Sequence, residues 1–75
     1  MSSAFILINC EPNSASDVKE KINEIPEIED AGQVFGAYDC IVKTKDMPHE
    51  KIRDIISEKI RPIEKVRTTL TLPVD

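Results

Sequence analysis

Apolar and polar positions follow three patterns along the chain, and the first pattern predicts a buried strand. Residues 4–8 read Ala-Phe-Ile-Leu-Ile, a continuous apolar run that Asn9 and Cys10 extend. A continuous run of strand length indicates that both faces of the strand are buried, whereas a half-exposed strand would alternate. We therefore expect a central strand over residues 4–10.

The second pattern has the period of a helix. Between residues 14 and 26 the apolar positions recur at i, i+4 and i+7, at Val18, Ile22 and Ile25. This spacing places them on one face of a helix. Ser14 is the expected cap of this helix, and Pro26 stops it.

A second helix is expected between about Pro48 and Pro62. Pro48 suits the first turn of a helix, and Asp46 or Met47 occupies the cap position. The apolar stripe of this helix consists of Ile52, Ile55, Ile56, Ile60 and Ile63.

The remaining segments predict three further strands. Residues 31–35 and 38–44 flank Gly36 and indicate a β-hairpin, because glycine adopts the positive φ that tight turns need. Residues 65–72 alternate, which is the third pattern, and Pro73 closes that strand. Its two faces carry Val66, Thr68, Leu70 and Leu72 on one side and Arg67, Thr69 and Thr71 on the other.

The order of elements, βαββαβ, predicts an α+β fold of the ferredoxin-like type. This fold is a four-stranded antiparallel sheet with two helices on one face. Its first and third strands are neighbours at the centre of the sheet. The helices cover one face only, although the first strand is apolar on both. A second copy of the chain is the expected cover, so we expect a homodimer that forms through the sheets.

Composition and charge narrow the classes of function. The chain has 75 residues, which predicts a single domain over residues 1–75. Domains of this size bury only about 60% of their unfolded surface, so a partner subunit would help stability. A formal net charge of −4 without a block of Lys or Arg argues against direct nucleic-acid binding. The apolar run is too short to cross a membrane, and Met1-Ser2-Ser3 lacks the basic start of a signal peptide. We expect a cytoplasmic protein.

The cysteines and the single histidine are the candidate metal ligands. Cys10 and Cys40 lack the spacing of a zinc site and are expected to be buried free thiols. We expect the first and third strands to run parallel, which would hold the two cysteines too far apart for a disulfide. A copper or zinc site of Met47, His49 and a cysteine is an alternative, but two clustered ligands are a weak signal. The pattern favours Met47 as a packing residue and His49 as an exposed residue, and no cofactor is expected.

The hairpin carries the first candidate ligand-binding residues, Gly36, Tyr38 and Asp39. The Asp39 carboxylate could pair with the ammonium group of an amino acid, or it could hydrogen-bond its own turn. Gly36 could serve the turn alone or also let a ligand approach the backbone. Tyr38 is suited to a contact between subunits.

The last strand offers a second half of the candidate site. The hydroxyl groups of Thr69 and Thr71 share one face and could donate to a ligand carboxylate, or they could reflect the strand preference of threonine. Arg67 shares that face and would be the stronger carboxylate partner, unless it is solvated or pairs with another subunit.

Together these motifs resemble the effector-binding domain of the Lrp/AsnC, or feast/famine, regulators. The resemblance covers nearly the whole chain and is carried by Val34-Phe35-Gly36 with Tyr38-Asp39, and by Val66 followed by Thr69 and Thr71. It implies a domain that dimerises through its sheets, associates into rings of dimers and binds amino acids or related metabolites between dimers. It also implies that Gly36 and the other hairpin residues named above, with the two threonines, contact the ligand.

The resemblance leads to a hypothesis about function. Family members with a regulatory role carry an N-terminal helix-turn-helix, whereas this chain begins at the first strand and resembles the stand-alone form. We expect an oligomeric, amino-acid-sensing domain that modulates full-length regulators of its family by ligand-dependent co-assembly. The alternatives are an assembly module without a ligand and a metal-handling domain. We expect no enzymatic activity, because the first strand projects only apolar side chains apart from Asn9.

Overall fold

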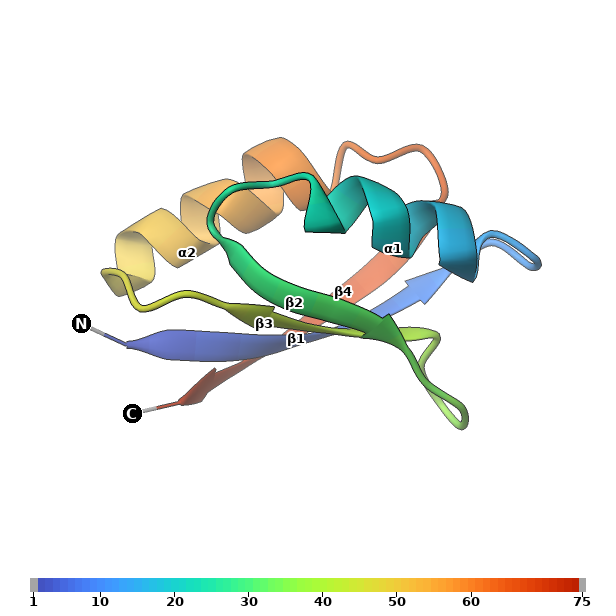
Figure 1. Ribbon diagram of the computed structural model, residues 1–75, viewed down its shortest axis with the longest axis horizontal. Helices are drawn as coiled ribbons and strands as arrows, with labels where there is room; N and C mark the ends of the chain where they lie inside the picture. Colours follow the sequence, from blue (N-terminus) through green and yellow to red (C-terminus); the bar gives the residue numbers. More distant parts are fainter. Residues whose placement is uncertain (1, 75) are drawn as a thin grey trace.

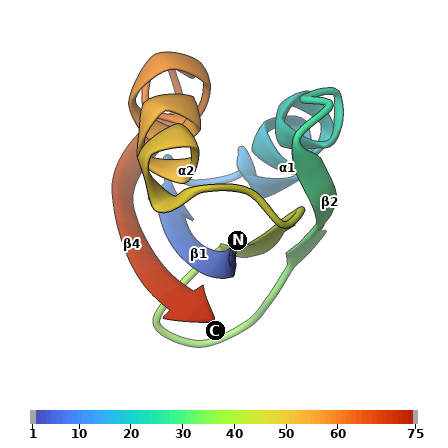
Figure 2. The ribbon, with the colours of Figure 1, turned by 90° about the vertical axis from the view of Figure 1, so that its left-hand side faces the viewer.

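The computed structural model describes residues 2–74 and has the expected order of elements. The four strands are β1 (Ser3–Cys10), β2 (Ile28–Gln33), β3 (Cys40–Thr44) and β4 (Val66–Val74). Helix α1 (Ala15–Asn23) links β1 to β2, and helix α2 (His49–Ile55) continues into the π-helical segment η1 (Ile56–Ile60). Both helices lie on the same side of a curved sheet (Figures 1 and 2). The predicted ferredoxin-like α+β fold is therefore confirmed.

The strand order is β2-β3-β1-β4, and every neighbouring pair is antiparallel. The expectation that the first and third strands run parallel is wrong. The crossover through α1 makes β2 parallel to β1, and the hairpin then reverses β3 into the space between them. Ile8 lies opposite Cys40, so Cys10 and Cys40 lie near the same end of the sheet. Both are buried free thiols, as expected, but the argument that separated them does not hold.

The helix-facing side of the sheet forms the core. Side chains of alternate residues of β1 and β3 pack there against both helices, and each large aliphatic side chain contributes about 1.5–3 kcal/mol of burial free energy. The least exposed members are Ile6, Ile8, Val18, Ile22, Cys40, Val42 and Ile60. Of the three positions that predicted the first helix, Val18 and Ile22 are fully buried and Ile25 is partly buried against this cluster.

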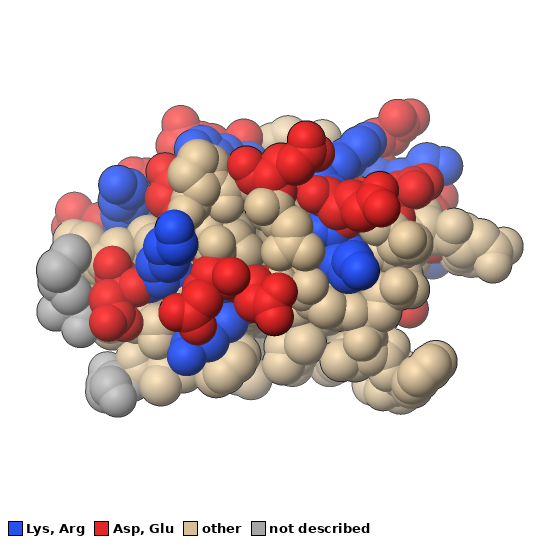
Figure 3. Space-filling model, in the orientation of Figure 1, with Lys and Arg blue, Asp and Glu red and all other residues tan. Residues whose placement is uncertain are grey.

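The opposite side of the sheet carries an uncovered apolar surface. We call it the outer-face stripe, and it consists of Phe5, Leu7, Ile41, Leu70 and Leu72. The register places Phe5 opposite Leu72 and Leu7 opposite Leu70. Leu70 and Leu72 are each 44% exposed. Charged side chains gather over the helices and beside β2, whereas the lower side of the molecule is mostly uncharged (Figure 3).

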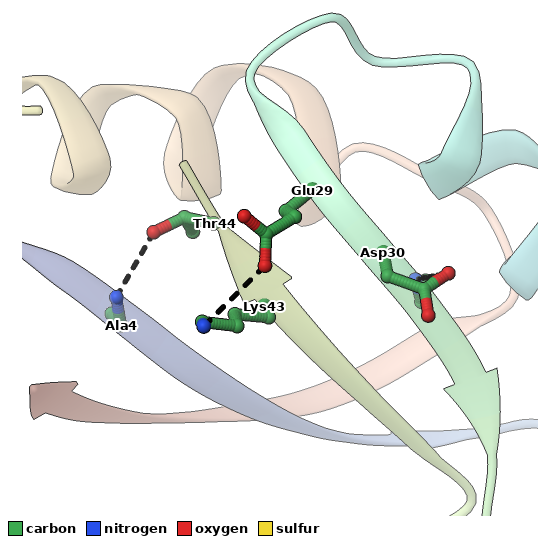
Figure 4. A network of polar contacts seen from close by, with 6 residues as sticks. Ala4, Glu29, Asp30, Lys43 and Thr44 are labelled. Carbon is green, nitrogen blue, oxygen red and sulfur yellow. Dashed lines mark hydrogen bonds and ion pairs between the residues drawn. The ribbon is translucent and has the colours of Figure 1, made fainter. Parts of the chain in front are cut away.

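Polar contacts frame the outer-face stripe along β3. Lys43 pairs with Glu29 of β2 at 3.4 Å, and its ammonium lies 5.9 Å from the centre of the Phe5 ring. On the other face, Thr44 accepts a hydrogen bond from the Ala4 amide at 3.0 Å (Figure 4). The stripe therefore has a charged edge on the β2 side.

The hairpin between β2 and β3 is longer than predicted. β2 begins at Ile28 and ends at Gln33, and β3 begins at Cys40, so residues 34–39 form a loop. The Val34 amide donates to the Asp39 carbonyl at 3.0 Å and closes this loop. Gly36 has a φ of 113°, which agrees with the turn role expected for it. The loop projects at the end of the molecule away from the two termini (Figure 1).

Strand β4 departs from the predicted alternation at its start. A register shift separates the pair Asn9 and Thr68 from the pair Cys10 and Val66, so Arg67 is the extra residue of a β-bulge. Val66 consequently packs against the core and does not share the face of Leu70. At its other end β4 continues to Val74, and Pro73 is accommodated because β4 is an edge strand.

The helix starts also differ from expectation. Ser14 precedes α1, but its hydroxyl donates to the Glu11 carbonyl and not to the helix. Pro48 is itself the cap of α2, because Met47 pairs with Ser2 in an isolated bridge and remains extended. Within residues 2–74, no helix is long and apolar enough to cross a membrane.

Candidate ligand-binding site

The carboxylate of Asp39 is tied to the central strand through one oxygen. Its Oδ2 accepts a hydrogen bond from the Cys10 amide at 2.8 Å, and the Asp39 amide donates to the Ile8 carbonyl at 2.9 Å. The β1–β3 ladder ends at the pair of Ile8 and Cys40, so no residue of β3 is paired with Cys10, and Asp39 takes its amide. Asp39 is half-buried, and the structure records no hydrogen bond to its Oδ1 within residues 2–74.

A hollow of about 310 Å³ opens beside Asp39. Its wall consists of Asn9, Cys10, Asp39, Arg67 and Thr68. We call it the Asp39 hollow. It brings one carboxylate and one guanidinium to the same small space, a combination that is complementary to a zwitterion. Its volume lies at the lower end of the range of about 300–1,000 Å³ that is typical of small-molecule sites.

An adjoining hollow of about 370 Å³ lies along the start of β4. Its wall consists of Arg61, Val66, Arg67, Thr68 and Thr69, and we call it the Arg61 hollow. The two hollows share Arg67 and Thr68, so they meet at the bulge of β4. The Nε–H of Arg61 donates to Thr69 Oγ1 at 3.3 Å.

Arg67 is already in contact with one acidic residue. Its Nε lies 3.5 Å from Glu11 Oε2, and both side chains are about half exposed or more. Exposed ion pairs of this kind contribute only about 0–1 kcal/mol, so Glu11 does not fully occupy the guanidinium. The terminal nitrogens of Arg67 have no recorded partner within residues 2–74.

The other residues predicted for the site lie outside these hollows. In the described structure neither hollow is lined by Gly36, Tyr38 or Thr71. Tyr38 is half-buried in the hairpin loop, and Thr71 lies opposite Ile6 on the helix-facing side of β4. Thr69 lies opposite Ile8 on the same side of β4. A single chain therefore brings Asp39, Arg67 and Thr69 close to one another and leaves three predicted residues apart.

Arg61 is the residue that reading the sequence missed. It follows η1, where the Arg61 amide donates to the Ile56 carbonyl at 2.8 Å, the spacing of a π turn. Ile56 and Ile60 of this segment are both buried in the core, and the chain leaves it toward β4. The sequence carries no clear signal for the π turn, because the spacing of Ile55, Ile56 and Ile60 also fits the apolar stripe of an ordinary helix.

The two thiols near the Asp39 hollow have raised pKa values. Burial, with smaller contributions from nearby Cys10 and Asp39, raises the pKa of the Cys40 thiol to about 11. Burial also raises the pKa of Cys10. Both thiols are therefore protonated at neutral pH, whereas nucleophiles and metal ligands need the thiolate.

The residues considered for a metal do not converge. Within the described residues 2–74, no group of three or more His, Cys, Asp or Glu side chains is arranged to hold a metal ion. Met47 is buried in the core, and His49 is exposed with its Nε2 2.9 Å from the Ser2 hydroxyl. These residues have packing and surface roles in this structure.

Comparison with known proteins finds one family and its relatives. The family model described as the Lrp/AsnC ligand binding domain matches residues 3–74. The HTH-type transcriptional regulator PF0250 of Pyrococcus furiosus is 32% identical over 74 residues, which is 95% of this chain and 49% of that protein. The chain therefore spans about half the length of the curated relatives it matches.

Solved structures share the fold over the whole chain. The crystal structure of hypothetical protein PHS023 from Pyrococcus horikoshii has a TM-score of 0.92 and 33% identity, and covers 100% of this chain and 90% of that one. Transcriptional regulator NMB0573 from Neisseria meningitidis, solved as a complex with L-Met, has a TM-score of 0.86 over 99% of this chain and 49% of that one. The second is only 13% identical, so its likeness concerns the fold alone.

Proposed function

Because the chain belongs to the Lrp/AsnC ligand-binding-domain family, we propose that it binds a small-molecule effector and thereby modulates transcription regulators of that family. The curated relatives that it matches carry the name HTH-type transcriptional regulator and are about twice its length. On this proposal the chain is a regulatory domain and not an enzyme, it acts in the cytoplasm, and DNA is contacted by the full-length partner.

The effector is an amino acid or a related metabolite. The observation that carries this is the Asp39 hollow, where a half-buried carboxylate with one uncommitted oxygen faces a guanidinium. Asp39 receives the ligand ammonium, and Arg67 receives its carboxylate through terminal nitrogens that Glu11 does not use. The L-Met complex of the Neisseria regulator supports an amino acid as the class of ligand.

Gly36, Tyr38, Thr69 and Thr71 complete the proposed site. Gly36 shapes the loop, and Tyr38 contacts a neighbouring subunit beside the ligand. Thr69 and Thr71 provide hydroxyl donors along β4. Since Gly36, Tyr38 and Thr71 line neither hollow of one chain, they join the site when subunits assemble.

Assembly uses two surfaces. The outer-face stripe dimerises with the same stripe of a second copy, which would cover Leu70 and Leu72. Phe35 in the hairpin loop is fully exposed, at 105% of its reference area, and contacts a neighbouring dimer in a higher oligomer. Full-length regulators of the family contain the same domain, so one of them can replace a subunit of this chain in the oligomer.

Ligand binding controls this assembly by a population shift. A ligand that contacts residues of two subunits binds the assembled state more tightly than the separated state. It favours assembly by the difference between those two binding free energies.

The test is a thermal-shift screen of the twenty amino acids, read beside light scattering. We expect one chemical class to raise the melting temperature and the assembled mass together, because binding to the native state stabilises it by mass action. No shift with any amino acid, with unchanged mass, would contradict the sensing function.

An assembly module without a ligand is the second candidate, because Asp39 already has a structural partner in the Cys10 amide. Asp39→Asn separates the two functions, since its amide oxygen can still accept from Cys10 but its charge is lost. We expect it to fold and assemble but to lose the ligand response. Asp39→Ala should in addition lose about 1–3 kcal/mol of stability, because the partly buried Cys10 amide loses its acceptor.

A further inference from the structure

The Arg61 hollow extends the proposed amino-acid site with a second positive charge. Arg67 and Thr68 line both hollows, so a ligand whose carboxylate is held by Arg67 has the Arg61 hollow directly beside it. The charged groups that line the two hollows are Asp39, Arg67 and Arg61. Glu11 also contacts Arg67, but only at its Nε, in an exposed ion pair that leaves the terminal nitrogens to a ligand. A complementary ligand carries one positive group followed by two negative groups.

Arg61 is held in place but remains available to an anion. Its Nε–H donates to Thr69 Oγ1 at 3.3 Å, which fixes one edge of the guanidinium. The ion pairs recorded within residues 2–74 join Lys43 to Glu29, Lys59 to Glu27 and Arg67 to Glu11, and none involves Arg61. Arg61 differs from the other basic residues without a recorded ion pair because it lines a hollow that adjoins Asp39 and Arg67.

The backbone explains why Arg61 reaches this position. The π turn of η1 places Ile60 in the core and Arg61 at the end of the helix, and a short loop leads from there to Val66. Arg61 is exposed, follows the buried Ile60 along the chain and contacts Thr69 through its Nε–H. A guanidinium with free terminal nitrogens can bind a carboxylate with two parallel hydrogen bonds.

From this arrangement we propose that the effector is an acidic amino acid, with its ammonium on Asp39, its α-carboxylate on Arg67 and its side-chain carboxylate on Arg61. The proposal rests on the amino-acid site proposed above and adds the chemistry of the ligand's side chain. Asparagine and glutamine, which have the same shape without the second charge, are the matched comparison ligands.

The experiment compares L-glutamate with L-glutamine, and L-aspartate with L-asparagine, by titration calorimetry on the whole chain. We expect one acidic ligand to bind about ten-fold or more tightly than its amide, since a charge-assisted hydrogen bond is roughly twice as strong as a neutral one. Arg61→Gln should bring the acidic ligand to the affinity of its amide. Arg53→Gln is the matched control, because Arg53 is an exposed arginine of α2 that lines neither hollow.

The outcomes separate this proposal from the proposed function. If an amide binds as tightly as its acid in the wild-type chain, or if Arg61→Gln keeps the preference, the side-chain assignment is overturned while amino-acid sensing stands. The side-chain assignment is also overturned, and amino-acid sensing stands, if the acidic ligands do not bind while another amino acid binds in a way that depends on Asp39. If none of the twenty amino acids binds, both proposals fail together.

Discussion

At the scale of single residues, Asp39 combines a structural contact with a proposed binding contact. Its Oδ2 is engaged by the Cys10 amide, which fixes the carboxylate at the base of the hairpin. A fixed carboxylate loses little conformational freedom when a ligand binds, and such preorganisation favours affinity. The sequence left open that Asp39 hydrogen-bonds its own turn, whereas the structure shows the Cys10 amide of β1 as the partner of its side chain. This contact uses Oδ2 and leaves Oδ1 for the proposed ligand.

Cys40 predicts how stability depends on pH. An exposed cysteine thiol has a pKa of 9.0, and burial raises the pKa of Cys40 to about 11 in the folded state. The folded chain therefore holds the thiol proton more tightly than the unfolded chain. The contribution of this thiol to the free energy of unfolding is expected to be complete below pH 9. It should fall as the pH rises from about 9 to about 11, by up to about 1.4 kcal/mol per pH unit.

Urea unfolding with a reductant, at several values of pH across this window, measures the effect. Cys40→Ala is the comparison, because lysines titrate in both proteins and cancel in the difference. The difference in unfolding free energy between the two proteins should shrink as the pH rises. A difference that stays constant with pH would show that the Cys40 thiol does not carry the effect.

At the scale of elements, the hairpin loop depends on Gly36. Its φ of 113° lies in a region that side chains other than glycine rarely adopt. We expect Gly36→Ala to lower the free energy of unfolding by about 1–3 kcal/mol. Gly32→Ala is the matched control, since Gly32 has no positive φ and an added Cβ there has no atom within 4 Å in the chain.

Chemical denaturation at one fixed protein concentration tests this pair. Gly32→Ala should change stability by no more than about 0.5 kcal/mol. If Gly36→Ala and Gly32→Ala lower the free energy of unfolding equally, the positive φ of Gly36 is not the cause of the loss.

The order and type of the elements could be predicted because hydrophobic period depends only on local geometry. Four of the five isoleucines expected in the second helix lie in α2 and η1, and Ile63 follows them in the loop. These isoleucines and the apolar run of β1 indicate their elements without knowledge of the rest. The relative direction of β1 and β3 could not be read in this way, because it depends on how a helix and a hairpin turn the chain. That error separated Cys10 from Cys40, which the sheet brings near each other.

The candidate site was predicted less completely than the fold. Asp39 and Arg67 carry recognisable chemistry in a turn and a strand, and they line the same hollow. Arg61 was missed because an arginine at a helix end looks like a solvated residue. Its place beside Thr69 depends on a π turn and a bulge, and each of these shifts a register by one residue. The sequence pattern of one chain also does not show which residues meet at a site between subunits.

At the scale of the whole molecule, we expect the outer-face stripe to determine the smallest stable unit. A 75-residue chain that leaves apolar side chains of β1 and β4 uncovered has little stability to spare. Leu70→Glu places a charge in the stripe, and burial of an unpaired charge is strongly unfavourable. We expect this variant to reduce the mass in solution to that of the 8.4 kDa monomer.

Light scattering at micromolar concentration measures the change. Ser57→Glu is the matched control, because it adds the same charge to an exposed position of η1 in the helix layer. It should leave the mass of the wild type unchanged. A dimeric Leu70→Glu protein would mean that the subunits do not associate through the sheet.

The bond between the Cys10 amide and Asp39 also gives this protein a spectroscopic probe of its own site. An amide proton changes its resonance frequency when the charge on its acceptor is shared with another cation. In an isotope-labelled sample the Cys10 amide should therefore shift when an ammonium group reaches Asp39. Because this amide belongs to the central strand, one resonance would report occupancy of the site without any label on the ligand.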